Sequence, residues 1–333
     1  MKMGSKPDAA LFRQHLENLK KETWLGEERS WWPRFLFHFA DINNVVSILK
    51  NGELLSRLAA KKQNDFVDSA SPEIIARTGT RRKDNVRFYL RPRTPMLYSI
   101  EGFRPLGRWQ YNAHCPMPIY LLYDFESIIC RDDSSFSYGS LAHGSAEVYK
   151  TAEAFMTMPF KFIYHEGSFH QDERDKIIFH RHAEVIVPKS VGLEDLNYIW
   201  CRSQAEYETL HYLLPDEVWS RWRDKIFTRT DFNLFNRRWI YVDKVTLTDK
   251  QITFNFNPAL EIRDQSPFRA ELEIYETFTG KRYVWTDGQY VIPRTNLVFS
   301  LANMTRPNDY TVTLLLDGNI AYKNRYQALD IPF

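Results

Sequence analysis

The run Asn85–Ile100, NVRFYLRPRTPMLYSI, is the stretch of this sequence from which the fold can be worked out most directly. It opens with Val86–Leu90, an apolar and aromatic segment of the kind that forms a strand. Three more strands are predicted around it, at Arg34–Phe39, Ile119–Tyr123 and Ile177–Val187. These strands do not alternate regularly with helices, as the strands of a parallel βαβ sheet would. The pattern predicts an α+β fold for this part of the chain.

Two helices are predicted before the segment Asn85–Ile100. Phe12, Leu16 and Leu19 recur at helical spacing near the N-terminus. Asp41 can cap a second helix, which Asn51-Gly52 would end. Both predictions place a short helix against the predicted strands.

Farther along, Ser203 and Glu206 have the spacing of a capping box, which would open a helix through about Leu214. Residues 57–85 are rich in charged residues, Ser, Thr and Gly, and predict a long loop.

After about residue 236 helical periodicity ends and strand patterns take over. Turn residues at Gly280, Asp287-Gly288 and Asp317-Gly318 separate apolar segments, as in an antiparallel sandwich or barrel. The predicted strands are Arg238–Leu247, Gln251–Phe256, Ala270–Phe278, Leu297–Leu301 and Thr311–Leu316. We therefore expect a domain boundary near 230–237, with an α+β domain over 1–236 and a sandwich-like all-β domain over 237–333.

The composition agrees with two globular domains. The chain has 333 residues, of which 44% are hydrophobic, and about 150 residues make a typical domain. No apolar run approaches the ~20 residues of a membrane-spanning helix, and the N-terminus lacks the apolar core of a secretory signal. The three cysteines, Cys115, Cys130 and Cys201, are widely spaced. We expect a cytoplasmic protein without disulfides or membrane association.

The formal net charge of +2 conceals a strongly basic segment. Residues 73–108 hold nine basic and three acidic residues, and eight of the nine are arginines. Aromatic residues interleave with them at Tyr89, Tyr98, Phe103, Trp109 and Tyr111. Arginines with aromatics suit single-stranded nucleic acid, because phosphates take the charge and bases stack. A solvated loop beside core aromatics, or a site for the pyrophosphate of a dinucleotide, would also fit this composition.

Several common catalytic motifs are missing from the sequence. GxGxxG, GxxxxGK[ST], GxSxG and HExxH do not occur, which disfavours Rossmann and P-loop phosphate binding. His180, His182 and Glu184 alternate along a predicted strand and could present three metal ligands on one face. No cysteine or further carboxylate completes such a site, and a face that tolerates histidine explains the pattern as well, so we expect no metal.

Glu184 interrupts an apolar strand end, Ala183–Val187. A carboxylate there is costly to bury unless it is paired or functional, and an exposed strand face is the other interpretation.

Four blocks of sequence carry a resemblance to a known family. Asn85–Ile100 resembles the signature block of the DarT family, NAD-dependent ADP-ribosyltransferases that modify nucleobases. Three further blocks appear in the family's order, one before Asn85–Ile100 and two after it: Phe37–Leu55 (FHFADINNVVSILKNGELL), Phe136–Ala142 (FSYGSLA) and Arg181–Pro188 (RHAEVIVP). Together they cover roughly residues 34–215, and 237–333 falls outside the resemblance. The family implies a split, mostly antiparallel sheet with NAD+ held in its cleft.

The resemblance also implies roles for individual residues. Glu184 matches the catalytic glutamate, and His38 matches the histidine that contacts the NAD+ ribose. Arg77 is the best match for the loop arginine that binds the pyrophosphate and positions the acceptor base, and Arg81 and Arg82 are close competitors for that role. The other implied NAD+-binding residues are Arg81, Tyr89, Arg93 and Tyr98. The remaining arginines of the basic segment are expected to bind nucleic acid: Arg82, Arg87, Arg91, Arg104 and Arg108.

Two departures from the family's pattern, His182 and the serine-rich FSYGS, leave the modified base open. The chemistry implied is transfer of ADP-ribose through an oxocarbenium-like state, which a carboxylate stabilises. Glu184 could also take the proton of the attacking base, and the base must be unpaired to reach the cleft.

The leading hypothesis is a toxin-like enzyme that moves ADP-ribose from NAD+ to a base of single-stranded DNA, in a toxin–antitoxin system or in phage defence. Transfer to RNA, transfer to protein, and an inactive nucleic-acid-binding module are the alternatives. The resemblance implies an antitoxin, for example a macrodomain that removes ADP-ribose. The β-rich tail could dock that antitoxin, a chaperone or nucleic acid, or could simply cap the transferase domain.

Overall fold

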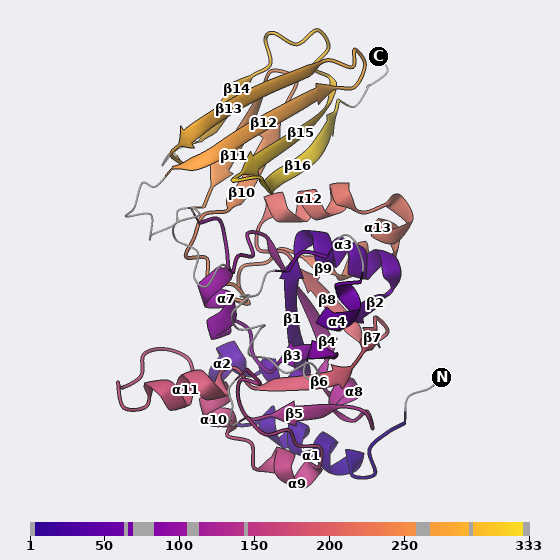
Figure 1. Ribbon diagram of the computed structural model, residues 1–333, viewed down its shortest axis with the longest axis vertical. Coiled ribbons are helices and arrows are strands. Elements are labelled where there is room, and N and C mark those ends of the chain that lie inside the picture. The colour runs from indigo at the N-terminus through magenta and orange to yellow at the C-terminus, as the bar shows by residue number, and fades with distance from the viewer. Residues whose placement is uncertain are drawn as a thin grey trace.

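The computed structural model describes residues 4–62, 66–68, 83–104, 113–142, 146–257, 267–292 and 296–328. A mixed sheet with helices forms one end of the molecule, and a β-sandwich forms the other (Figure 1). The α+β fold and the C-terminal sandwich predicted from the sequence are confirmed. None of the helices in these ranges is long and apolar enough to cross a membrane.

The central sheet has seven strands in the order β5-β6-β3-β1-β4-β8-β9. Its neighbours are antiparallel except for the parallel pair β8 and β9. The strands are β1 (Phe35–Asp41), β3 (Asn85–Tyr89), β4 (Pro118–Asp124), β5 (Ser135–Ser137), β6 (Glu184–Pro188), β8 (Leu196–Trp200) and β9 (Ile226–Phe227). The signature run thus supplies β3, between β1 and β6. A separate pair, β2 (Glu53–Leu55) and β7 (Ser190–Gly192), lies beside this sheet.

The helices begin and end where local chemistry requires. In α3 (Ile42–Asn51), the Asp41 side chain accepts a hydrogen bond from the Asn43 amide at 3.0 Å, and Gly52 ends the helix with φ +76°. The helix α1 (Ala9–Leu19) buries the predicted apolar face. The other helices of the described ranges are α2 (Gly26–Arg29), α4 (Arg57–Ala60), α7 (Pro95–Ile100), α8 (Phe125–Ile129), α9 (Ala152–Met156), α10 (Phe160–Ile163), α11 (Arg174–His180), α12 (Gln204–Leu213) and α13 (Asp216–Trp222).

The predicted capping box of α12 is only half formed. Ser203 Oγ accepts from the Glu206 amide at 3.2 Å, as predicted. The Glu206 carboxylate does not return to Ser203 and instead accepts from the Arg202 amide at 2.9 Å and from its guanidinium. A charged partner at the same helix end has displaced the reciprocal bond of the box.

The sandwich consists of two antiparallel sheets, β10-β11-β14 and β13-β12-β15-β16. Its strands are β10 (Val242–Leu247), β11 (Gln251–Phe256), β12 (Phe268–Glu276), β13 (Arg282–Tyr290), β14 (Leu297–Ser300), β15 (Asp309–Leu316) and β16 (Asn319–Gln327). Every second residue of β12 is buried, so one face of its sheet packs inward. Two of these strands, β13 and β16, are absent from the prediction.

Two predicted turns of the sandwich are correct and one is wrong. Gly280, with φ +70°, lies in the turn between β12 and β13. Asp317 and Gly318 have φ +48° and +76° and join β15 to β16 as a tight hairpin turn. Asp287-Gly288 lies inside β13, where the register with β12 shifts. The glycine therefore marks a β-bulge, which from sequence is easily confused with a turn.

The predicted strand Ile177–Val187 is wrong in its first half. His180 ends the helix α11, His182 lies in the following turn, and only Glu184 is in a strand. The three residues therefore do not alternate on one strand face, and the predicted set of metal ligands loses its geometric basis. No group of three or more metal-ligating side chains occurs within the described ranges.

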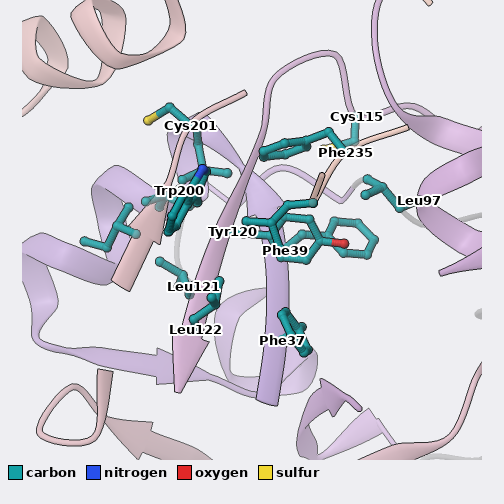
Figure 2. Packing of buried hydrophobic residues seen from close by; sticks show 14 of the residues in the cluster. Phe37, Phe39, Leu97, Cys115, Tyr120, Leu121, Leu122, Trp200, Cys201 and Phe235 are labelled. Carbon is teal, nitrogen blue, oxygen red and sulfur yellow. The ribbon is translucent and has the colours of Figure 1, made fainter. Parts of the chain in front are cut away.

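Aromatic side chains fill the core beside β1 and β4. Figure 2 shows Phe39 and Tyr120 close to Leu97 of α7, with Phe235 packed nearby. The ring centroids of Tyr120 and Phe235 are 5.2 Å apart. A residue just before the sandwich thus enters the core of the central sheet. All three cysteines are buried and free.

Candidate active site

A cavity of about 710 Å³ opens in the α+β part of the molecule, with every lining residue between His38 and Glu184. Its walls come from β1, α3, β2 and α4, from β3 and β6, and from α7 and α11. This volume lies within the range of ligand pockets in proteins, about 300–1,000 Å³. The cavity is large enough for a ligand of considerable size and is lined by both apolar and charged groups.

Glu184 lies in the wall of this cavity at the first position of β6. It pairs across the ladder with Tyr89, and only 3% of its surface is exposed. Its Oε2 atom is 3.5 Å from Nη1 of Arg87, on the neighbouring strand. A buried carboxylate needs a positive partner to remain ionised, and Arg87 supplies one.

His38 of β1 lines the same cavity. Its Nδ1–H donates to the backbone carbonyl of Arg87 at 2.9 Å. Burial lowers the pKa of His38, which keeps the ring neutral near pH 7. With the proton on Nδ1, Nε2 is the acceptor nitrogen of the ring.

Tyr89 and Met96 form part of the wall between β3 and α7. Tyr89 stacks on Phe39 with an interplanar angle of 11°, and its hydroxyl lies 3.2 Å from the sulfur of Met96. Burial raises the pKa of Tyr89, and the nearby Glu184 carboxylate adds to that effect. The phenol therefore stays protonated at neutral pH and can donate a hydrogen bond.

The structure thus brings four of the predicted residues together in one cavity: His38, Arg87, Tyr89 and Glu184. Arg87, predicted to bind nucleic acid, lies beside Glu184 inside the cavity. The predicted residues Arg77, Arg81, Arg82 and Arg108 lie outside the described residues.

Two predicted arginines lie away from the cavity lining. Arg91 is 2% exposed, donates to the carbonyls of Ile163 and His165, and pairs with Glu166. Arg93 also pairs with Glu166, at 2.7 Å, from a backbone position with φ +51°. Both guanidiniums are directed to the segment after α10, where they hold backbone carbonyls and a carboxylate.

Tyr98 and Arg104 also lie outside the lining. Tyr98 is 47% exposed, and the guanidinium carbon of Arg238 sits 4.0 Å from its ring centroid. Arg104 is 2% exposed, donates to the Tyr98 carbonyl at 2.9 Å and covers the ring of Trp239. These two residues contact the chain that leads into the sandwich.

Two cavity residues were missed from the sequence. Arg57, at the start of α4, lines the cavity and pairs with Asp68 at 3.3 Å. His182 lines it from the turn before β6, and its Nδ1–H donates to the Ile178 carbonyl at 3.0 Å. Burial lowers the pKa of His182. Nothing in the local pattern marks Arg57, whereas His182 was considered from the sequence only as a possible metal ligand and as a departure from the family's pattern.

The cavity combines the buried Glu184 carboxylate with two histidines, His38 and His182, and three arginines, Arg57, Arg87 and Arg174. The arginines suit the phosphates of a dinucleotide, and the carboxylate can stabilise positive charge that develops on a sugar.

Comparison with known proteins gives a consistent family assignment. A family model described as "ssDNA thymidine ADP-ribosyltransferase, DarT" matches residues 37–233, more than half of the chain. No curated protein sequence is significantly similar to this chain.

Solved structures that are similar to this chain include proteins of Thermus sp. 2.9 and Thermosipho africanus. Thermus sp. 2.9 DarT in complex with ADP-ribosylated ssDNA has a TM-score of 0.48 and 19% identity, over 60% of this chain and 96% of that one. The same protein in complex with NAD+ has a TM-score of 0.45 and 18% identity, over 60% and 97%. Thermosipho africanus DarTG in complex with ADP-ribose has a TM-score of 0.43 and 17% identity, over 65% and 53%.

Proposed function

This chain belongs to the DarT family of NAD+-dependent ADP-ribosyltransferases, and from that premise we propose that it transfers ADP-ribose to a base of single-stranded DNA, with thymine as the acceptor that the family's description names. The observation that supports this most directly is Glu184, buried in the cavity wall with Arg87 at 3.5 Å and facing the ligand space shared with His38. A carboxylate at that position can serve the reaction twice.

The first service is electrostatic. Cleavage of the bond between nicotinamide and C1′ of the ribose leaves the electron pair on nicotinamide and positive charge on C1′ and the ring oxygen. The Glu184 carboxylate stabilises that charge within a water-poor cavity, where such stabilisation is strongest. Arg87, whose Nη1 lies 3.5 Å from the carboxylate, offsets part of the cost of burying its charge.

The second service is proton transfer. A ring nitrogen of the acceptor base forms the new bond to C1′ and loses its proton to Glu184, so charge and atoms balance. His38 accepts a hydrogen bond from a ribose hydroxyl through Nε2, and Arg57 binds the pyrophosphate. A base in a duplex cannot reach this wall, which favours single strands.

The experiment uses NAD+ labelled on the adenylate with single-stranded DNA and RNA oligonucleotides of the same sequence, and a protein extract as third acceptor. Label on DNA supports the proposal, and mass spectrometry of the product gives the modified base. Label on RNA or protein alone would replace DNA as the substrate. No label on any polymer, with NAD+ bound, would favour the inactive binding module.

In the cell, we propose a toxin whose modification an antitoxin such as a macrodomain hydrolase reverses, in a toxin–antitoxin system or in phage defence. Expression of the chain should arrest growth, Glu184→Gln should not, and co-expression of an ADP-ribosyl hydrolase should restore growth. Arrest by the Glu184→Gln variant would contradict this role.

A further inference from the structure

A buried carboxylate, Glu101, connects one wall of the cavity to the chain that enters the C-terminal sandwich. The helix α7 contributes Met96, Ser99 and Ile100 to the cavity, and Glu101 is the residue that follows it. Glu101 is 1% exposed, although it points away from the cavity toward the chain that enters the sandwich.

Every hydrogen bond that Glu101 accepts comes from a donor far away in sequence. Oε1 accepts from the Arg237 amide at 2.9 Å and lies 3.4 Å from the Arg202 guanidinium. Oε2 accepts from the amide and the side chain of Asn236 at 2.8 and 3.0 Å. Both oxygens are therefore required as acceptors, which only a carboxylate can provide.

The segment Asn236–Tyr241, which we call the strap, runs along the chain after α7. The Phe103 amide donates to the Ile240 carbonyl at 2.7 Å. Gly102 lies so close to the strap that an added Cβ would be 2.9 Å from Cβ of Trp239. The strap thus fixes the residues on both sides of Gly102.

The sandwich in turn holds the strap through Asn257, which follows β11 and is 6% exposed. Its side-chain oxygen accepts from the Tyr241 amide at 2.9 Å, and its side-chain nitrogen donates to the Trp239 carbonyl at 3.1 Å. Its own amide donates to the Tyr241 carbonyl at 3.1 Å. Three hydrogen bonds from one sandwich residue therefore set the position of the strap.

A second contact fixes the sandwich to the rest of the molecule. Ser203 Oγ donates to the Val242 carbonyl at 2.7 Å, and the Tyr322 hydroxyl donates to Glu208 at 2.7 Å. The helix α12, which carries Glu208, lies directly beneath the sandwich (Figure 1). The sandwich that holds the strap is therefore itself fixed to the α+β part of the molecule, through Ser203 and α12.

We propose that the C-terminal sandwich braces the cavity, by holding the α7 wall in place through the strap and Glu101. Glu101 is a positioning residue for the transfer reaction, and this inference rests on the proposed function of the cavity. The strap lies beyond residue 233, where the family match ends, so the brace is an addition of this chain to the matched region.

The test compares Glu101→Gln with a matched control, Glu276→Gln. The glutamine side chain has the shape of the glutamate but only one acceptor oxygen, because an NH₂ group replaces the other oxygen. The two hydrogen bonds that the replaced oxygen accepted would then face a donor and be lost. Glu276 is also fully buried and accepts hydrogen bonds from Thr279, Tyr283 and the Arg306 amide, all within the sandwich. Asn257→Ala is a second test variant that leaves Glu101 itself unchanged.

Amide hydrogen exchange of residues 95–104 and the Kd of NAD+ are measured for each variant, together with kcat and KM on single-stranded DNA. In Glu101→Gln and Asn257→Ala, exchange of 95–104 should rise about tenfold, since loss of buried hydrogen bonds favours local opening. The Kd of NAD+ or the KM of the oligonucleotide should rise by about fivefold or more. Glu276→Gln should leave the exchange of residues 95–104, the Kd of NAD+ and the KM of the oligonucleotide unchanged. This should hold even if its melting temperature falls as much as that of Glu101→Gln.

Unchanged exchange in 95–104, equal acceleration in the control, or faster exchange with unchanged ligand affinity would each overturn the brace. If the parent protein proves inactive on DNA, the proposed substrate fails, and hydrogen exchange with NAD+ affinity still decides this inference.

Discussion

Arg87 Nη1 lies 3.5 Å from Glu184 Oε2, although the register of β3 and β6 pairs Glu184 with Tyr89 and Arg87 with Ile186. The ion pair therefore runs diagonally along the ladder, within the reach of a long side chain. His38 is joined to the same strand, because it donates to the carbonyl of Arg87. The backbone carbonyl of Arg87 thus orients His38, while the Arg87 side chain faces the Glu184 carboxylate.

Glu184→Gln should abolish transfer and spare NAD+ binding. The amide keeps the shape of the side chain and loses both its charge and its basicity, so kcat should fall by about 10²–10⁴. The Kd of NAD+, measured by calorimetry, should change less than about threefold, because affinity comes from other groups. Loss of NAD+ binding equal to that of a His38 variant would contradict this division of roles.

Arg87→Gln separates a role in the cavity from a role on the nucleic-acid backbone. Beside Glu184, the loss of the cation should lower kcat by about 10–100-fold even at saturating oligonucleotide. A phosphate contact would instead raise KM and reduce the salt slope of binding by about 1. Steady-state kinetics at several salt concentrations distinguish the two, and Arg87→Lys, which keeps the charge, should retain part of the activity.

His38→Asn should weaken NAD+ binding by about tenfold, or roughly 1.4 kcal/mol. Asparagine can place its amide nitrogen near the position of Nδ1 and keep the bond to the Arg87 carbonyl, while it removes the acceptor at Nε2. The melting temperature should therefore change little. Titration calorimetry measures the effect, and an unchanged Kd would exclude a ribose contact.

Acid should destabilise the protein through His114, which is 9% exposed and donates from Nε2 to the Gly102 carbonyl at 3.0 Å. Burial lowers the pKa of His114 from 6.5 to about 4. The unfolded chain then binds more protons between these pH values, so the free energy of unfolding falls as pH drops from 6.5 through 4. With about 1.4 kcal/mol for each tenfold change in proton affinity, the loss is roughly 3 kcal/mol.

Urea unfolding at pH 7.5, 6, 5 and 4 measures this loss. His114→Gln keeps a donor for Gly102 and removes the titrating group, so its free energy of unfolding should depend less on pH in that range. An identical pH dependence in the variant would show that other buried histidines account for it.

Two glycines with the same backbone conformation should respond differently to alanine. Gly52 has φ +76° with no atom within 4 Å of an added Cβ, so Gly52→Ala should cost about 1–2 kcal/mol of strain. Gly102 has φ +79° and meets Trp239 and the Ile240 carbonyl at 2.9 and 3.1 Å. Gly102→Ala should cost about 1–3 kcal/mol more, because the strap must move. Equal losses in urea unfolding would mean that the strap yields easily.

Local chemistry explains why parts of the fold were predictable. The cap at Asp41 and the stop at Gly52 depend on near neighbours, and both appear as expected, as does a strand, β12, over most of the predicted Ala270–Phe278. The helix at Arg174–His180 was not predicted, because a short apolar run can form a helix or a strand and tertiary packing decides between them.

The candidate site shows the same limit. Glu184 and His38 stand out by residue type and by family pattern, and the structure places both in one cavity. Arg87, Arg91 and Arg93 look alike in sequence, yet the first faces Glu184 and the other two reach Glu166. The strand register places Arg87 beside Glu184, and Glu166, more than 70 residues away in sequence, binds Arg91 and Arg93. Neither relationship can be read from the residues next to these arginines.

The long separation between Glu101 and its donors sets an order of events during synthesis. Asn236 follows Glu101 by 135 residues, and Asn257 comes later still. At about 5–20 residues per second, a ribosome needs many seconds to pass from one to the other. A nascent chain that ends before the strap has β1, β3 and α7 but cannot complete the wall that α7 forms. The proposed brace of the α7 wall can therefore form only after residue 257 has been synthesised, long after the strands and the helix that it supports.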